Sequence, residues 1–488
     1  MSLTIPLIQL RDWSGGTATA INDFKMPDNM MRLIINAHAD ESYGNQYGSI
    51  MSSPGYALLG DAENTNTILG MTTFTASDDS FSWLIRARNS DDDSKAIIEY
   101  LNEPTNTWHE IGFSPIALEK DRKVRFTTFL NYLFFSNGFD TPKTWDGDIT
   151  HNWGTTHVIN APIGDNIINF SDRVFISSGS TAYISSFFDA GTITWDVVNS
   201  YIKPNPDDND KLVAMSPLGG LLGFFKQRSR YTFNGQYTQA DRITDTGAIN
   251  QESIQNIQGI CYYPATTYTT LGIFEDKGEF PINIGRPIQG ILDAVPQSQY
   301  PLFAAYKDDD HYRLYLGGDV TYKDITIPKM YISYCVSKGT WSLGSLRHGL
   351  TVSTNYITVA DNAQAQVGIA FGTDTGKVFQ WNSGDSYGGL PIDTILRTKR
   401  IDFGTKASIK SITRIVFYSD QPQGAIVRVR IDGKEWKPLT TLDAPIVDQE
   451  MNITGKSFEF EVAASNLQER FIFEGMDITY AHMDRSLR

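Results

Sequence analysis

A Thr-Trp pair recurs along the chain, and its spacing limits the folds that this sequence can adopt. The spacing is roughly 40–50 residues or a multiple of that, which is the repeat length of β-propeller blades. Each blade is a small sheet that cannot bury both faces alone, so blades must stack around a common axis. The pairs are Thr107-Trp108, Thr144-Trp145, Thr194-Trp195 and Thr340-Trp341. The repeat therefore predicts a β-propeller.

Short apolar and aromatic runs between these pairs are typical of blade strands. Turns such as Asn137-Gly138 and Asn234-Gly235 separate them, because tight hairpin turns require positive φ angles. Aromatic residues make up 12% of the 488 residues, and 40 residues are glycine; this composition favours many short strands over helices. The predicted fold class is all-β, a β-propeller with six or seven blades.

The pattern changes at both ends of the predicted propeller. Residues 1–50 are polar, contain no blade and are predicted to form an extended N-terminal arm. Residues 51–394 hold the blades. Between residues 395 and 488 the strands lengthen and alternate between polar and apolar side chains, and the Asp432-Gly433 pair indicates a hairpin. One buried face per sheet predicts a C-terminal β-sandwich.

The net charge of −15 limits the partners of the chain. An acidic surface repels nucleic-acid phosphates and anionic membranes, so tight binding to either is disfavoured. No apolar run approaches the roughly 20 residues needed to cross a bilayer, and the first residues lack the pattern of a signal peptide. The only cysteines are Cys261 and Cys335, without a CxxC motif, which fits folding in a reducing compartment.

No motif of a catalytic or cofactor site stands out. The closest histidines, His151 and His157, have no cysteine nearby, so a zinc site is not predicted. P-loop, GxGxxG and HExxH strings are missing from the sequence. Cys261 lies in an apolar, aromatic stretch, which is typical of a core residue rather than a nucleophile. We expect no cofactor, no metal and no enzymatic activity.

Three aspartate clusters fall between predicted strands and supply the candidate site residues. Each cluster is either a solvated loop tip or part of a channel wall or inter-subunit face. The second cluster lacks the glycine and the distal glutamate of an EF-hand calcium loop. The candidates are Asp91, Asp92, Asp93, Asp207, Asp208, Asp210, Asp308, Asp309 and Asp310.

Three Asp-x-Gly turns loosely resemble the Asp-boxes of sialidase propellers. They begin at Asp189, Asp276 and Asp374, and an aromatic residue follows each, but the leading serine of an Asp-box is missing. Glycoside hydrolysis also requires two carboxylates in one cleft, which the sequence does not place. A propeller that binds or hydrolyses glycans is the alternative function. A third interpretation, an intracellular scaffold of the WD40 or kelch type, has less support because the blade signatures of those repeats are missing.

Several short strings follow one another in an order shared with a known family. They are DNMMRLIIN at 28–36, GSIMSSPGY at 48–56, SDRVF at 171–175, GFFK at 223–226, YTFNG at 231–235, GKVFQW at 376–381 and LRTKRIDF at 396–403. Together they span most of the chain. In this order the sequence resembles the tail nozzle, or tail hub, proteins of short-tailed (podovirus) bacteriophages.

The resemblance implies a structural virion protein. Such a subunit forms a ring, expected to be a homohexamer, at the distal end of the phage tail, where genomic DNA is retained and ejected. The implied partners are further copies of the chain, the tail adaptor or connector proteins, and tail fibres or spikes. Assembly would take place in the host cytoplasm, without membrane insertion. An acidic wall would let double-stranded DNA pass without tight binding, because fixed lysine contacts to phosphates would hold the duplex.

Overall fold

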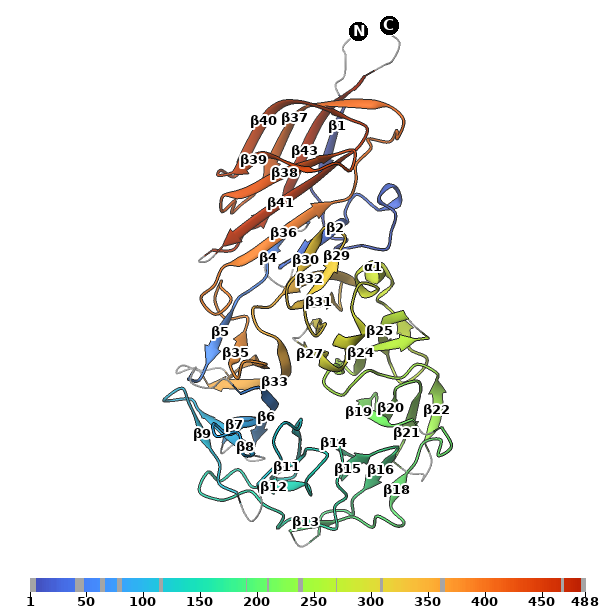
Figure 1. Cartoon of the computed structure of the whole chain (residues 1–488), viewed down its shortest axis with the longest axis vertical. Coiled ribbons are helices and arrows are strands. Elements are labelled where there is room, and N and C mark those ends of the chain that lie inside the picture. Colours follow the sequence, from blue (N-terminus) through green and yellow to red (C-terminus); the bar gives the residue numbers. More distant parts are fainter. Residues whose placement is uncertain are drawn as a thin grey trace.

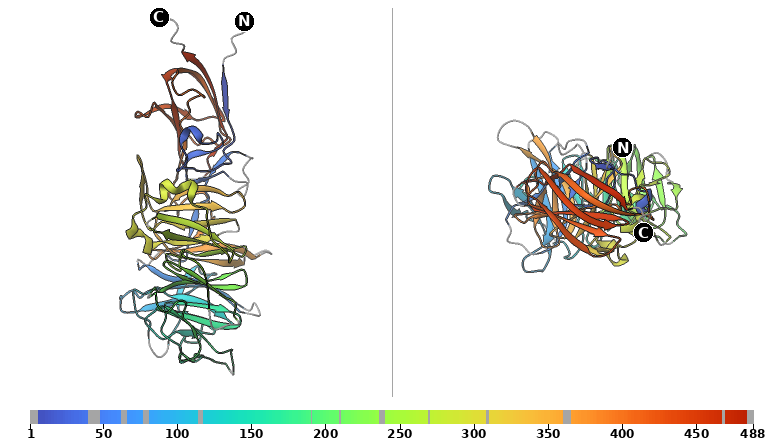
Figure 2. Two further views of the ribbon diagram at one scale, coloured as in Figure 1. Left: turned by 90° about the vertical axis from the view of Figure 1, so that its right-hand side faces the viewer. Right: turned by 90° about the horizontal axis from the view of Figure 1, so that it is seen from above.

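The computed structural model describes the chain except residues 1–5, 40–47, 62–65, 77–80, 114–116, 190, 209, 236–239, 269, 308–309, 360–364, 467–468 and 484–488. The described residues are almost entirely strands and turns. They form a propeller at one end of an elongated molecule and a sandwich at the other (Figures 1 and 2). Among the described helices, none has the length and apolar character needed to span a membrane.

Seven small antiparallel blades form the propeller, and the sixth of them is one end of a larger sheet. The predicted all-β propeller is confirmed. The first blade contains β6 (Ile68–Thr75), β7 (Ser82–Asn89), β8 (Ala96–Asn102) and β9 (Thr107–Glu110). The second contains β10 (Arg125–Phe129), β11 (Tyr132–Ser136) and β12 (Lys143–Trp145). The third and fourth contain β14 (Asn166–Phe170), β15 (Arg173–Ser178), β16 (Thr181–Ile184) and β18 (Tyr201–Ile202), then β19 (Leu212–Leu218), β20 (Leu221–Lys226), β21 (Arg230–Phe233) and β22 (Asp241–Thr244).

The remaining three blades complete the ring. The fifth and sixth contain β23 (Gln255–Ile257), β24 (Ile260–Thr267), β25 (Thr270–Asp276) and β26 (Ile282–Asn283), then β27 (Ala304–Lys307), β28 (His311–Tyr315), β31 (Met330–Cys335) and β32 (Thr340–Ser345). The seventh contains β33 (Leu350–Val359), β34 (Ala365–Thr373), β35 (Val378–Trp381) and β5 (Tyr56–Leu59). Contacts between inner strands run from β6 through β10, β14, β19, β23, β27 and β33 back to β6.

An early segment of the chain closes the ring. β5 lies before the first blade in the sequence, yet it pairs with β35 as the outer strand of the seventh blade, with Leu58 opposite Phe379. The Tyr56 ring stacks on Tyr387 with a centroid distance of 4.7 Å, and its hydroxyl accepts a hydrogen bond from the Arg347 N–H at 3.1 Å. The first and last blades are thereby joined by backbone pairing.

The Thr-Trp pairs do not occupy one position within the blades. Trp108 and Trp341 lie on outer strands, in β9 and β32, whereas Trp145 ends the third strand of its blade. Trp195 follows β17 (Ile193–Thr194), which pairs with β13 (Val158–Ile159) between the second and third blades. The repeat therefore reflects the length of a blade rather than a fixed place in it.

Two packed sheets form the sandwich. One contains β1 (Leu7–Leu10), β43 (Gly475–Met483), β37 (Ile409–Tyr418) and β40 (Ile446–Gly455) in that order. The other contains β2 (Met31–Ile35), β36 (Ile392–Thr398), β41 (Phe458–Asn466), β38 (Ala425–Ile431) and β39 (Trp436–Leu442). Their facing side chains, among them Ile412, Phe417, Val427 and Phe460, share one apolar core.

The described part of residues 1–50 is not an extended arm. β1 pairs with β43, and β2 lies between β32 and β36. All five residues of β2 are buried, which explains why this segment lacks the alternation of a half-exposed strand. β3 (Ala37–His38) and β4 (Ile50–Ser52) form a further sheet with β42 (Ile472–Phe473).

β2 joins the two parts of the molecule in one sheet. The sixth blade continues through β32, β2, β36, β41, β38 and β39 as a nine-stranded sheet. Ile35 contacts Leu343 of the blade on one side and Ile395 of the sandwich on the other. A hairpin of the same blade, β29 (Val320–Tyr322) and β30 (Ile325–Ile327), also reaches the sandwich end (Figure 1).

Short helices complete the fold. Short 3-10 helices cover Asp23–Lys25, Arg286–Ile288 and Gln297–Leu302, and α1 (Gln289–Leu292) is the single α-helix of the described chain. α1 packs beside β25 and β29, at the edge of the sixth blade. The helices therefore act as connections and do not form a layer.

Candidate functional site at the mouth of the propeller

Charged side chains meet across the bore on the face where the inner strands begin. Arg125 is the first residue of β10 in the second blade, and Glu252 precedes β23 of the fifth blade. Arg125 Nη2 lies 2.7 Å from Glu252 Oε1, and Arg125 Nε donates to the same oxygen at 3.0 Å. Because the two blades are not neighbours in the ring, this ion pair spans the mouth of the bore.

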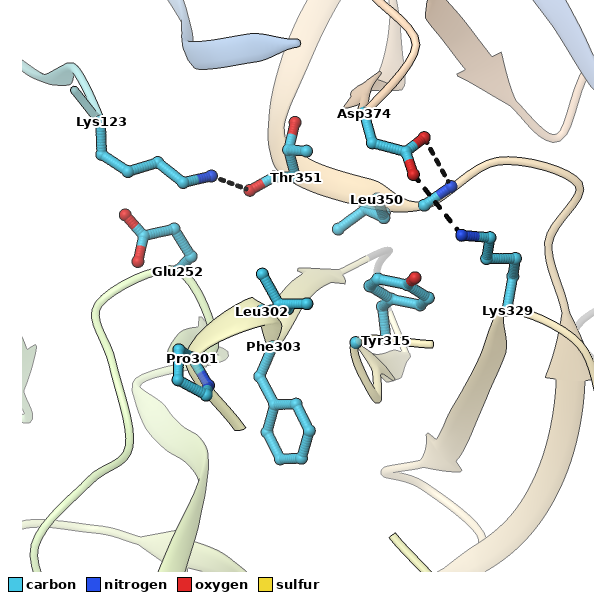
Figure 3. Close-up of a pocket in the computed structure, with 12 residues that line it drawn as sticks. Lys123, Glu252, Pro301, Leu302, Phe303, Tyr315, Lys329, Leu350, Thr351 and Asp374 are labelled. Atoms are coloured by element: carbon cyan, nitrogen blue, oxygen red, sulfur yellow. Dashed lines mark hydrogen bonds and ion pairs between the residues drawn. The ribbon is translucent and has the colours of Figure 1, made fainter. Parts of the chain in front are cut away.

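Two further hydrogen bonds extend the cluster to other blades. Arg125 Nη1 donates to the Asp165 carbonyl oxygen, just before the third blade, at 2.8 Å. Lys123 Nζ donates to the Thr351 carbonyl oxygen of the seventh blade at 3.1 Å (Figure 3). The cluster therefore connects four of the seven blades at one end of the channel.

The surroundings keep Glu252 ionised. Burial would raise the pKa of Glu252, but Arg125 and Lys123 lower it, and the net pKa lies below the ordinary value of 4.5. Burial also lowers the pKa of Lys123, against the opposing charge of Glu252. The Glu252 side chain is 11% exposed, so its charge depends on these two cations rather than on water.

A cavity of about 150 Å³ lies beside the cluster and between the sixth and seventh blades. Its walls include Leu302, Tyr315 and Leu350 (Figure 3). Asp374 lies at its edge, where Oδ1 accepts the Gly349 N–H at 3.0 Å and Oδ2 lies 3.5 Å from Lys329 Nζ.

The two carboxylates of this cavity are poorly arranged for glycoside hydrolysis. A glycosidase needs one carboxylic acid with a raised pKa to protonate the leaving group. The pKa of Glu252 is shifted in the opposite direction, and both oxygens of Asp374 are occupied by Gly349 and Lys329. Both carboxylates instead form ion pairs between blades, Glu252 with Arg125 and Asp374 with Lys329.

The first predicted aspartate cluster caps the turn between β7 and β8. Arg88 Nη1 donates to Asp91 at 2.7 Å, and Lys120 Nζ donates to Asp93 at 2.6 Å. Hydrogen bonds from Ser90 and Ser94 lower the pKa of Asp92 to about 2. These contacts order the turn.

The second cluster lies between β18 and β19. Asp208 Oδ1 lies 2.6 Å from the fully buried Lys226 Nζ, and Asp210 accepts the Arg228 N–H at 3.1 Å. Asp207 is exposed. Asp208 therefore satisfies a buried ammonium group.

Only one residue of the third cluster is described. Asp310 accepts hydrogen bonds from the Ser337 N–H at 3.0 Å and the Cys335 Sγ at 3.1 Å. Asp308 and Asp309 lie outside the described residues. Asp310 thus links two turns of the sixth blade.

The three clusters do not share one face of the propeller. Asp91, Asp92 and Asp93 follow the second strand of a blade, and Asp207 to Asp210 lead into an inner strand, so both lie on the face where inner strands begin. Asp310 follows the inner strand β27 and lies on the opposite face. The described aspartates therefore do not form one continuous acidic wall within a single chain.

The Asp-x-Gly turns also differ in position. Asp276 ends the third strand of its blade, Asp374 follows a second strand, and Asp189 precedes β17. Asp276 is fully buried beside Arg230, with 2.7 Å between Oδ2 and Nε. In the described part of the chain, no three His, Cys, Asp or Glu side chains are grouped as a metal site would require.

The charged group at the mouth of the bore, Lys123, Arg125 and Glu252, is called the mouth cluster below. It could not be identified from the sequence. Arg125 and Glu252 are 127 positions apart, so no local pattern connects them. The one available signal is a charged residue at the start of a predicted apolar strand, in Val124-Arg125-Phe126.

Comparison with known proteins gives likenesses of structure only. No protein-family model and no curated protein matches the sequence. YCF48 from Cyanidioschyzon merolae is 10% identical over 67% of this chain and 98% of that chain, with a TM-score of 0.41. The Dos1 propeller is 10% identical over 68% of this chain and 96% of that chain, with a TM-score of 0.42. The extracellular domain of the putative one component system BT4673 from B. thetaiotaomicron is 8% identical over 87% of this chain and 59% of that chain, with a TM-score of 0.43. The chain is a seven-bladed β-propeller protein on the evidence of its own strand order.

Proposed function

We propose that this chain is a structural subunit of the tail nozzle of a short-tailed bacteriophage. In this proposal, copies of the chain form a ring at the distal end of the tail, and genomic DNA is retained and released through the centre of that ring. The order of sequence strings that resembles the nozzle family motivates the proposal.

The observation that supports it best is the way the two parts of the molecule are joined. The nine-stranded sheet runs from the sixth blade into the sandwich without interruption. The joint at β2 opposes bending, because it combines the Ile35–Leu343 pairing to the blade, the antiparallel pairing to β36 and the burial of all five residues of β2. Such a rigid, elongated subunit suits the wall of a conduit under load.

The mouth cluster supports a passage between copies rather than through one propeller. Arg125 and Glu252 cross the bore, and opening it would leave buried charges without partners, which costs several kcal/mol. DNA would therefore pass along outer surfaces of the subunits. The net charge of −15 would disfavour tight phosphate contacts on that path.

A glycan-binding or glycan-hydrolysing propeller is the alternative. The feature that favours it is the mouth cavity, where Glu252 and Asp374 both line the wall. The lowered pKa of Glu252 argues against an acid catalyst at this position.

The two functions are separated by the mass and activity of the purified full-length chain. We expect mass photometry to detect a closed oligomer, six copies by analogy with the family, and we expect no cleavage of bacterial surface polysaccharides. A stable monomer that cleaves polysaccharide would contradict the proposal. In that case Glu252→Gln and Asp374→Asn would test whether the mouth cavity is the active site.

A further inference from the structure

A basic pocket lies where the propeller meets the sandwich. Its cavity of about 200 Å³ is enclosed by β2, the tip of the β29–β30 hairpin, and the strands β36, β38 and β41. Five cationic and three anionic side chains line it, so the pocket is net positive in a chain whose net charge is −15. They are Arg32, Lys323, Arg397, Arg400 and Arg430, with Asp23, Asp324 and Glu459.

Ion pairs across neighbouring strands hold the arginines in place. Arg397 Nε donates to Glu461 at 2.7 Å. Arg400 Nε and Arg430 Nε each donate to Glu459 at 3.0 Å. Because Arg397 and Arg430 each make more than one such contact, their guanidinium groups are preorganised.

The pocket already holds a carboxylate from the propeller. Asp324, at the turn of the β29–β30 hairpin, accepts hydrogen bonds from Arg397 Nη1 at 2.8 Å, Arg430 Nη1 at 3.3 Å and Trp436 Nε1 at 3.2 Å. The Arg430 guanidinium also lies over the Trp436 ring, 4.6 Å from its centroid. This arrangement shows that the surface recognises an oxyanion by several converging donors.

Two further cations of the pocket are reached by solvent and have donors that no described residue accepts: Lys323 is exposed, and the Arg400 side chain is 34% exposed. Within the described part of the chain, the two terminal nitrogens of Arg400 have no hydrogen-bond acceptor, since its one bond uses Nε. The Lys323 ammonium has no carboxylate partner there and lies 5.2 Å from the centroid of the Tyr322 ring. The internal anions therefore do not use all of the binding capacity of the pocket.

We propose that this pocket binds a small oxyanion, a phosphate or carboxylate group, through Arg400 and Lys323 beside the Asp324 site. The planar end of an arginine offers two parallel donors that match either group, and a lysine adds a point charge. A cavity of about 200 Å³ accommodates one such group. The inference does not depend on the nozzle function.

The test is the thermal stability of the full-length chain in the presence of the anion. Unfolding would be followed with inorganic phosphate or with succinate, each at constant ionic strength. Because a ligand that binds the native state stabilises it in proportion to ln(1 + [L]/Kd), we expect Tm to rise with anion concentration. The anion that gives the lower Kd identifies the preferred group.

Three variants assign the effect to the pocket. The double variant Lys323→Gln/Arg400→Gln should weaken Kd at least about tenfold, the effect of losing about 1.4 kcal/mol. Lys434→Gln, an exposed lysine outside the pocket lining, should leave Kd unchanged. Asp324→Asn should instead tighten binding, because it removes a competing negative charge.

Several results would overturn the inference. These are an unchanged Tm of the wild-type chain with both anions, an equal Kd in the double variant, or weaker binding in Asp324→Asn when its Tm without anion equals that of the wild type. If Asp324→Asn lowers Tm by itself, direct calorimetric titration of the folded variant replaces the thermal readout.

Discussion

The propeller and the sandwich are both all-β, but they bury different side chains. In the propeller, the fully buried Arg230 of the fourth blade pairs with the fully buried Asp276 of the fifth. In the sandwich, one continuous apolar core lies between the sheets. Its ion pairs lie outside that core: Arg397–Glu461 is buried where the sandwich meets the propeller hairpin, and Arg414–Asp448 is half exposed.

The difference follows from how the sheets meet. Sandwich sheets pack face to face, so apolar burial alone specifies their arrangement. Most neighbouring blades meet through apolar clusters smaller than that of the sandwich, and the cluster between the fifth and sixth blades is the larger exception. We infer that buried ion pairs between blades fix their register, at the cost of desolvating the charges.

The largest expected effect breaks one of these pairs. Arg230→Met leaves the Asp276 carboxylate buried without its cation and should lower the free energy of unfolding by about 3–5 kcal/mol. Chemical denaturation measures this loss. The double variant Arg230→Met/Asp276→Leu should recover most of it, because no uncompensated charge then remains. A loss below about 1 kcal/mol in the single variant would show that the pair does not define the blade contact.

The next effect concerns the mouth of the bore and depends on pH. Glu252→Gln should cost about 1–3 kcal/mol at pH 7, because it weakens the acceptor for Arg125. Since the pKa of Glu252 is lowered in the folded chain, its stabilisation is complete above its ordinary value of 4.5 and is lost as pH falls through the folded value.

The stability difference between wild type and Glu252→Gln should therefore shrink below pH 4.5. Denaturation curves collected from pH 7 to pH 3 would follow it. Glu119 is a surface residue outside the cluster, and Glu119→Gln is the matched control. The difference in stability between this variant and the wild type should not change as the pH falls. A difference that is independent of pH would contradict the assignment of Glu252 as a buried anion.

A smaller effect is expected in the sandwich core. Ile412→Val removes one methylene group from a fully buried side chain and should cost about 0.5–1.5 kcal/mol. The loss should be the same at pH 7 and pH 4, because no charged group is involved. A pH-dependent loss would show that the apolar core and the charge network are coupled, which would blur the contrast between the two regions.

The smallest effect is expected on the outer surface of the sandwich. Arg414→Ala breaks the ion pair with Asp448, in which both side chains are about half exposed. Exposed pairs contribute little to stability and are screened by salt. The change in denaturation midpoint should therefore be small and should vanish at high salt. A loss comparable to that of Arg230→Met would remove the distinction between buried and exposed pairs.

The propeller could be predicted from the sequence because its signals are local. Glycine turns and short aromatic strands lie within single blades, and the spacing of the Thr-Trp pairs reflects the length of a blade. The closing strand β5 and the insertion of β2 could not be predicted, since their partners β35 and β36 lie more than 300 positions away in the chain. A strand that is buried on both faces, such as β2, also has no alternation to reveal it.

At the candidate site, too, only local features could be predicted from the sequence. The aspartate clusters are visible as runs in the sequence, but their roles depend on partners such as Lys226 and Ser337, which local patterns do not identify. The mouth cluster joins residues from four blades. Its members become neighbours only when the ring is closed.

A cryo-electron microscopy map of the assembled protein would show whether its subunits form a nozzle ring with closed propeller bores. We expect a ring of subunits with one open passage between them, and density for Arg125 and Glu252 across each propeller bore. Single chains whose bores are open, or whose mouth cavity holds a sugar, would contradict this expectation.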